Sequence, residues 1–227
     1  IIPSFVIAPT MIDEDGVIDH FLDLVRKHQI HAFHFFPQQA GWSLSDIAPV
    51  IREIQTLKPV LFLDAFVNIG DDLKGIMDFS AEFPQVSVIF TNAMWGHYNN
   101  LYKLMEACPN IFVDTSLLHM YLTYEYFIKH YGVERLIFGA GYKSNNGASI
   151  GSLVHAEISP DHAQMIAHGN LERMLGIESP LNGTRPVTGD RLWHRFLRQE
   201  RLGPDIVDGH THMSRTIAKW EDHDQTD

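Results

Sequence analysis

Short apolar runs alternate with segments of helical periodicity along most of this sequence, and the alternation predicts an α/β fold with a parallel sheet. The strand-like runs are almost continuously apolar, which is typical of strands covered on both faces. Their regular repetition favours a (β/α) barrel over a doubly wound open sheet. No Gly-x-Gly-x-x-Gly run follows the early strands and no Walker loop occurs, which weakens a nucleotide-binding open sheet further.

The expected elements follow one another from the N-terminus. The strand-like runs share an apolar core and cover residues 4–8, 31–36, 59–66, 86–90, 110–114 and 135–138. The expected helices have apolar side chains at three- and four-residue spacing and cover residues 13–29, 45–57, 71–83, 98–107, 121–131, 161–168 and 170–175. Residues 143–152 are rich in Asn, Gly and Ser and are expected to form a loop.

The composition and the apolar periodicity of the sequence change after residue 177. Residues 178–190 contain prolines and glycines with little apolar periodicity, which indicates a linker. A basic amphipathic helix is expected over 190–201, and a new strand begins at Ile206. The expected organisation is therefore a barrel over 1–177, a linker with a helix over 178–205, and the first strand of a second barrel over 206–227.

Composition limits the functions to consider. The chain has 227 residues, 45% of them hydrophobic, and a formal net charge of -11, which argues against nucleic acid and anionic membranes as partners. The one cysteine, Cys108, excludes an intrachain disulfide within this sequence, and we expect neither a signal peptide nor a membrane-spanning segment, because the sequence shows no such pattern. We expect a cytoplasmic protein that acts on a small molecule; formation of a homo-oligomer stays open.

The strongest chemical motif is the run Asp208–His212. His210 and His212 are two residues apart after an apolar pair, so in a strand both imidazoles project to the same face. That arrangement suits two nitrogen ligands of a divalent metal, zinc in the first place, and Asp208 could add a ligand or orient a histidine. The alternative is an exposed His-x-His pair in a tail.

Other polar residues follow the expected strands. Asp64 and Asp114 end two apolar runs, where a barrel has its functional rim. Capping or turn formation is the interpretation that we favour for Asp114, and the same alternatives apply to Asp64. His97 follows a third strand closely enough to reach a site, and its alternative is a structural role. His31 and His34 are expected to be packing or rim residues.

Several segments, taken in order over roughly residues 30–177, resemble the amidohydrolase-related group (amidohydrolase family 2) of metal-dependent TIM barrels. The segments that carry this resemblance are residues 83–92, 93–96, 110–116, 132–142 and 169–176. The group includes hydrolases and decarboxylases of aromatic acids. The resemblance implies a (β/α)8, TIM-barrel-like fold, a divalent metal cofactor and a small-molecule substrate.

The sequence departs from this pattern at the positions that carry chemistry. Asn92 stands where the resemblance implies a catalytic or metal-binding histidine, and Gly141 stands where it implies an aspartate. Asparagine is a poor zinc ligand and glycine supplies no general base, so residues 1–177 are expected to be a barrel with a degenerate metal site. Residues 203–213 resemble the first strand of the same group. The barrel is thus expected to be incomplete, its first strand missing or supplied by this C-terminal segment.

These observations leave several functional hypotheses. In the preferred one, the chain is an internal piece of a two-barrel protein that hydrolyses C–N or C–O bonds with a metal, and residues 1–177 are themselves catalytically impaired. In a second, the C-terminal strand completes the barrel as a permuted first strand. The remaining alternatives are a metal-dependent decarboxylase of the same superfamily and a non-catalytic binding or structural module.

Overall fold

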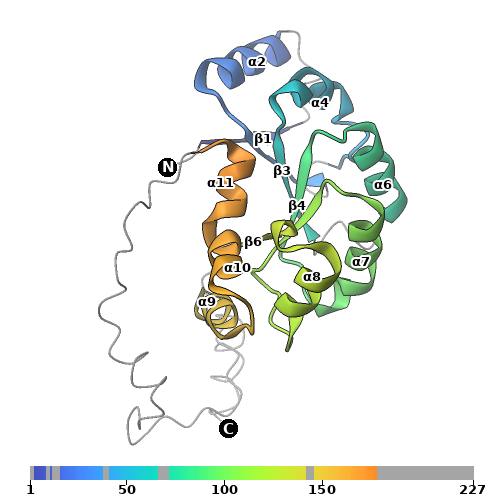
Figure 1. The fold of residues 1–227 in the computed structure, drawn as a ribbon. Helices are drawn as coiled ribbons and strands as arrows, with labels where there is room; N and C mark the ends of the chain where they lie inside the picture. The colour runs from blue at the N-terminus through green and yellow to red at the C-terminus, as the bar shows by residue number, and fades with distance from the viewer. Residues whose placement is uncertain are drawn as a thin grey trace, which may run out of the picture. The chain divides into compact units, whose positions relative to one another are not determined.

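The computed structural model describes residues 3–8, 11, 16–37, 41–65, 72–141 and 146–177 (Figure 1). The chain divides into two compact units, Ile1–Glu178 and Ser179–Asp227, and every described residue belongs to the first unit. The expected linker, the basic helix and the strand at residues 206–213 lie outside the described residues.

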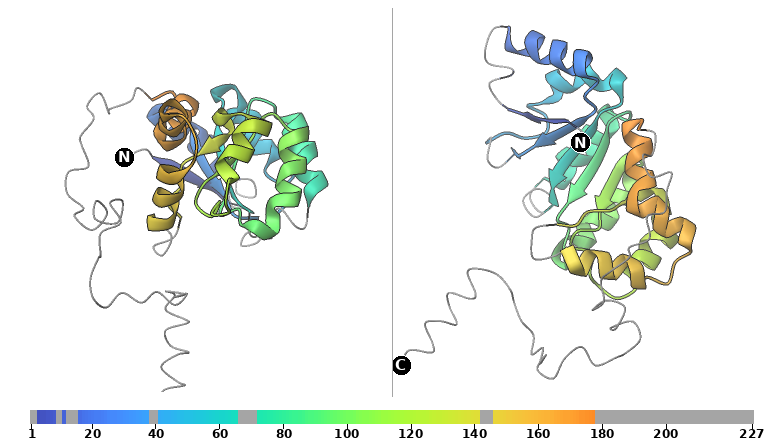
Figure 2. Two further views of the ribbon diagram at one scale, coloured as in Figure 1. Left: turned by 60° about the horizontal axis from the view of Figure 1, so that its bottom comes forward. Right: turned by 90° about the vertical axis from the view of Figure 1, so that its left-hand side faces the viewer.

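The described unit is built on a six-stranded parallel sheet in which each strand pairs with the next one along the chain. The strands are β1 (Ser4–Ile7), β2 (Ala32–Phe35), β3 (Val60–Asp64), β4 (Ser87–Thr91), β5 (Ile111–Asp114) and β6 (Leu136–Ile137). A doubly wound sheet reverses its strand order at a switch point, whereas the wall of a barrel keeps sequence order. The order β1 to β6 therefore confirms the barrel-like prediction, and the sheet fans out with a pronounced twist (Figure 2).

Helices follow the strands as the periodicity predicts. The helices after β1 to β5 are α2 (Val17–His28), α4 (Ala48–Ile54), α6 (Leu73–Glu82), α7 (Tyr98–Ala107) and α8 (Thr123–Tyr131). The chain after β6 contains α9 (Asn146–His155), α10 (Pro160–Gln164) and α11 (Asn170–Leu175), and a π-helical turn, Met165–Gly169, joins the last two.

The expected loop over residues 143–152 is wrong where the structure describes it, because residues from 146 on form α9. Asn, Gly and Ser have low helix propensity, so local preference predicts no helix here. Tertiary contacts explain the difference. The fully buried Ser149 hydroxyl donates to the Ser116 carbonyl at 3.0 Å, and Leu153 packs against the main hydrophobic core.

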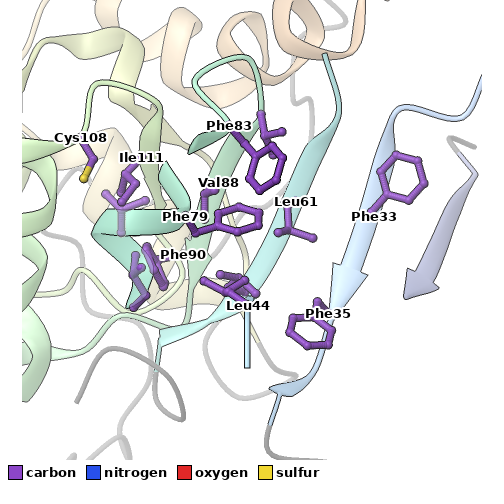
Figure 3. Packing of buried hydrophobic residues seen from close by; sticks show 14 of the residues in the cluster. Phe33, Phe35, Leu44, Leu61, Phe79, Phe83, Val88, Phe90, Cys108 and Ile111 are labelled. Carbon is purple, nitrogen blue, oxygen red and sulfur yellow. The ribbon is translucent and has the colours of Figure 1, made fainter. Parts of the chain in front are cut away.

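The larger hydrophobic core lies between the sheet and the helices α2 to α8. Because side chains alternate along a strand, Phe33 and Phe35 of β2 and Leu61 of β3 point to this side. Phe79 and Phe83, from α6 and its end, join them in the same layer, with their ring centroids 4.9 Å apart (Figure 3). We call this side of the sheet the outer face.

The opposite side, here called the inner face, is half apolar and half polar. It carries Val60 at the start of β3, Ile89 in the middle of β4 and Ile137 at the end of β6, and α11 packs on them through Leu175 and Met174. Figure 1 shows α10 and α11 on the side of the sheet away from α4, α6 and α7. The carboxyl end of the same face is polar.

Two buried asparagines attach helices to the ends of strands. The Asn170 side chain, fully buried at the start of α11, donates to the carbonyls of Val133 and Leu136, each at 2.8 Å. The Asn110 side chain, before β5, donates to the carbonyls of Ser80, Phe83 and Val86. Such amides satisfy carbonyls that would otherwise be buried without a donor.

Among the described residues, no helix combines the length and the apolar character needed to cross a membrane.

Candidate functional site

The carboxyl ends of β3, β4 and β5 bring three polar residues together on the inner face. Asp64 is the last residue of β3, Asn92 directly follows β4, and Asp114 is the last residue of β5. Asp64 shares its face with Val60 and Asp114 with Phe112, because side chains alternate along a strand. We call Asp64, Asn92 and Asp114 the rim cluster; it lies where parallel barrels have their sites.

Asn92 connects the two carboxylates of the rim cluster. Its side-chain Nδ2 donates to Asp64 Oδ2 at 3.0 Å, and its backbone N–H donates to Asp114 Oδ1 at 3.2 Å. Asn92 has a φ of 58°, in the left-handed region that asparagine tolerates better than most residues. This backbone conformation presents the side chain to β3 and the N–H group to β5.

Hydrogen bonds and close packing fix the carboxyl group of Asp114. Ser116 donates to Asp114 Oδ1 from its hydroxyl at 2.7 Å and from its backbone at 3.3 Å. A Cβ atom placed on Gly139, in the loop after β6, would be 2.1 Å from Asp114 Oδ2. Glycine at this position therefore leaves the room that the carboxyl group occupies. Asp114 thus accepts hydrogen bonds from Ser116 in a local turn and lies at the carboxyl end of β5, and a part in chemistry stays a prediction.

Burial raises the pKa of Asp114 to about 6. The residue is only 8% exposed, so its charged form loses hydration. The hydrogen bonds from Ser116 and Asn92 act in the opposite direction and favour the charged form, while the nearby Asp64 charge raises the pKa further. Asp114 therefore changes protonation close to neutral pH.

A second polar network holds α9 against the rim. The Ser149 hydroxyl lies 3.0 Å from the Ser116 carbonyl and 3.5 Å from the Ala140 carbonyl, and His119 Nε2 lies 3.4 Å from Ser149 Oγ. Burial lowers the pKa of His119. Sequence reasoning missed this network because it assigned residues 143–152 to a loop, and no motif marks Ser149 or His119.

Aromatic rings form the wall of the inner face on β2 and β3. The His34 ring stacks on Phe62 with centroids 4.9 Å apart and on Phe36 with centroids 6.2 Å apart. Burial lowers the pKa of His34, which favours the neutral imidazole. The expectation of a packing or rim role for His34 agrees with this position, whereas His31 lies before β2 and its Nδ1 is 3.0 Å from the Leu57 carbonyl.

Two further predicted site positions, His97 and Gly141, lie within the described residues. His97 ends a short 3₁₀ turn, Trp95–His97, where its Nδ1 accepts the Met94 N–H at 3.3 Å. Gly141 has a φ of 69° and places no side chain at the rim. Asp208, His210 and His212 lie outside the described residues.

The rim cluster does not fit a zinc ion. Zinc in proteins is bound by imidazole, thiolate and carboxylate groups, but the residue between the two carboxylates is an amide that donates to one of them. Within the described part of the chain, no group of three or more His, Cys, Asp and Glu side chains could hold a metal ion. What the rim offers is carboxylate acceptors, amide and hydroxyl donors, and one carboxyl group with a raised pKa.

No family model and no curated protein sequence matches this chain. Solved structures do match. A 2,6-dihydroxybenzoate decarboxylase in complex with 2,6-dihydroxybenzoate has a TM-score of 0.58 at 16% identity, over 78% of this chain and 70% of its own length. A 5-carboxyvanillate decarboxylase from Sphingomonas paucimobilis has a TM-score of 0.58 at 14% identity, over 76% of this chain and 66% of its own.

A third match is a 5-carboxyvanillate decarboxylase from Novosphingobium aromaticivorans complexed with manganese and 4-hydroxy-3-methoxy-5-nitrobenzoic acid. Its TM-score is 0.53 at 10% identity, over 70% of this chain and 60% of its own. This chain thus spans between 60% and 70% of the length of these enzymes. At such identities the likeness concerns the fold alone, and it confirms the expected fold class: the chain folds as an incomplete TIM-type barrel.

Proposed function

We propose that this chain is part of a metal-dependent enzyme of the amidohydrolase superfamily, and that the barrel of residues 1–177 is itself catalytically impaired. The parent protein would hydrolyse C–N or C–O bonds in a small molecule. The observation that supports impairment is the rim cluster, in which Asn92 donates to Asp64 at the place where a ligand imidazole is implied. Any metal-dependent step would then need residues from elsewhere in the protein.

The motif that could supply metal ligands is the Asp208–His212 run. His210 and His212 carry the residue types and the spacing of a metal pair, with Asp208 on the same expected strand face. We propose that a divalent metal binds there and not at the rim cluster. Manganese in a solved structure of the same fold is a reason to test it beside zinc.

Decarboxylation is the second candidate reaction. It is supported by the structures that match this fold, several of which are decarboxylases of hydroxylated aromatic acids. The aromatic wall of His34, Phe36 and Phe62 would suit a planar ring. The third candidate, a non-catalytic binding module, needs no metal at all.

One experiment separates these candidates. The purified full chain is analysed for zinc and manganese, and it is then assayed with 2,6-dihydroxybenzoate, 5-carboxyvanillate and a panel of small esters and amides. We expect bound metal that is lost in the double variant His210→Ala/His212→Ala and retained in Asp64→Asn. We also expect no metal-dependent turnover.

Three results would contradict this proposal or favour another candidate function. Metal-dependent release of CO2 would favour the decarboxylase, and metal-dependent turnover that disappears in Asp64→Asn would refute an impaired rim. A chain without metal under any loading condition would favour the binding module. The variant His162→Ala, which removes a partly exposed histidine at the start of α10, is the control for unspecific loss of imidazole.

A further inference from the structure

Each carboxylate of the rim cluster accepts a hydrogen bond from the same residue, Asn92. Asn92 offers Asp64 a side-chain N–H at 3.0 Å and Asp114 a backbone N–H at 3.2 Å. Each N–H group places a partial positive charge against a carboxylate oxygen. Asn92 therefore supplies both carboxylates with a partial positive charge, as a bound cation does at other sites.

The carboxylates need such a partner because they are close enough to interact. The charge of Asp64 disfavours ionisation of Asp114. Two neighbouring carboxylates are ordinarily relieved by a proton, a cation or hydrogen-bond donors. Here the donors are present already: one N–H of Asn92 is directed at an oxygen of Asp64 and another at an oxygen of Asp114, so these lone pairs are taken by hydrogens instead of a metal ion.

The surroundings hold Asp114 in this arrangement. Ser116 donates twice to Oδ1, and the Gly139 backbone lies beside Oδ2. Asp114 cannot swing away from Asn92 without breaking these bonds. The Asn92 side-chain amide, in contrast, can be changed by one substitution without disturbing these contacts of Asp114.

We infer that Asn92 takes the place of a cation between Asp64 and Asp114, so that the rim is a hydrogen-bonded site without a metal. It follows that exchanging the amide nitrogen for oxygen, Asn92→Asp, turns the rim into a site for a hard divalent cation. Three carboxylates would then converge, a ligand set that suits Mn²⁺, Mg²⁺ or Ca²⁺. This inference concerns the rim alone and does not depend on the reaction of the parent protein.

The test compares Mn²⁺ binding in full-length variants that all carry His210→Ala and His212→Ala, which removes the other candidate ligands. Thermal unfolding is followed at pH 8 with EDTA or with millimolar Mn²⁺, and calorimetric titration gives the stoichiometry. With Asn92 intact, we expect the same Tm under both conditions and no saturable binding. In Asn92→Asp, we expect a Tm lower by several degrees in EDTA and recovered in Mn²⁺, with one ion bound per chain.

The matched control is Asn99→Asp, the same chemical change at an exposed position in the first turn of α7. It should alter neither the Tm nor its response to Mn²⁺. If Asn92→Asp fails to fold, Asn92→Gly replaces it, because glycine suits a φ of 58° and removes the same amide. In that variant Mn²⁺ should raise the Tm while EDTA leaves it low.

Two outcomes would overturn the inference. One is saturable Mn²⁺ binding with Asn92 intact that disappears on Asp64→Asn, because the natural rim would then be a metal site. The other is an Asn92→Asp variant as stable as its parent in EDTA and indifferent to Mn²⁺, because the amide would then play no part in balancing the carboxylates.

Discussion

At the scale of single residues, the rim of this barrel depends on hydrogen-bond donors placed against buried or half-buried acids. Asn92 and Ser116 supply the donors, and the left-handed conformation of Asn92 lets a single residue reach two strands. The cluster holds one group, Asp114, whose protonation is set by burial. That group makes the stability of the chain sensitive to pH.

Asp114 should make the protein lose stability as pH rises through about 6. Its pKa is 3.8 in the unfolded chain and about 6 in the folded one, so folding favours the protonated form. The stabilisation is complete below the unfolded pKa and is lost as pH rises through the folded pKa. The full effect is on the order of 3 kcal/mol.

Urea denaturation of the natural chain and of Asp114→Asn, followed from about pH 4 to about pH 8, checks this prediction. As pH rises through 6, we expect the free energy of unfolding of the natural chain to fall relative to that of Asp114→Asn. Asparagine keeps an oxygen that can accept the bonds from Ser116 and Asn92, so the comparison isolates the charge. A difference between the two proteins that is constant with pH would contradict the prediction.

Gly139 is predicted to tolerate no side chain. Gly139→Ala would place Cβ 2.1 Å from Asp114 Oδ2, so the carboxyl group or the loop after β6 must move. We expect a loss of about 1–3 kcal/mol, measured by chemical denaturation. Gly151→Ala is the control, because nothing lies within 4 Å of its added Cβ and it is within α9. It should be neutral or stabilising. Equal effects of the two substitutions would show that the space at Gly139 is not filled.

At the scale of elements, two features depend on contacts far apart in the sequence. The helix α9 contains residues of low helix propensity, and Ser149 attaches it to the loops after β5 and β6. The helix α11 packs on the apolar part of the inner face, and Asn170 attaches it to the chain around β6. Neither arrangement can be predicted from local periodicity.

Asn170→Ala is expected to destabilise the protein by about 2–4 kcal/mol, because it leaves the carbonyls of Val133 and Leu136 buried without their donor. Thermal and chemical denaturation measure the loss. Asn99→Ala removes an exposed asparagine from α7 and should change stability by less than about 0.5 kcal/mol. If Asn170→Ala were as mild as this control, the amide would not be what holds α11 on the sheet.

At the scale of the whole molecule, the described unit is a barrel wall. Within the described residues β1 and β6 are the two edges of the sheet, and the chain covers 66% of the length of a decarboxylase of the same fold. Closing the wall requires strands from outside the described part. The strand predicted at residues 206–213 stays a prediction. It would be the first strand of a neighbouring barrel or a permuted strand of this one. The metal assay of His210 and His212 tests whether that segment binds a metal.

The sequence by itself determined the fold class and the row of residues at the rim. Continuous apolar runs such as that of β3 and β4 identify buried parallel strands, and Asp64, Asn92 and Asp114 end their runs where the carboxyl ends of parallel strands meet. Period-two alternation then puts Asp64 and Asp114 on one face. Periodicity is a local property, so one sequence suffices to predict these features.

Only the tertiary structure decided how the rim works. That Asn92 donates to both acids, that Gly139 makes room for Asp114, and that α9 is a helix all depend on residues more than twenty positions apart or on backbone angles that no pattern encodes. The raised pKa of Asp114 likewise arises from burial, which exists only after packing. Local preference selects the strands and most helices, whereas the chemistry of the rim is set by contacts that form when the sheet assembles.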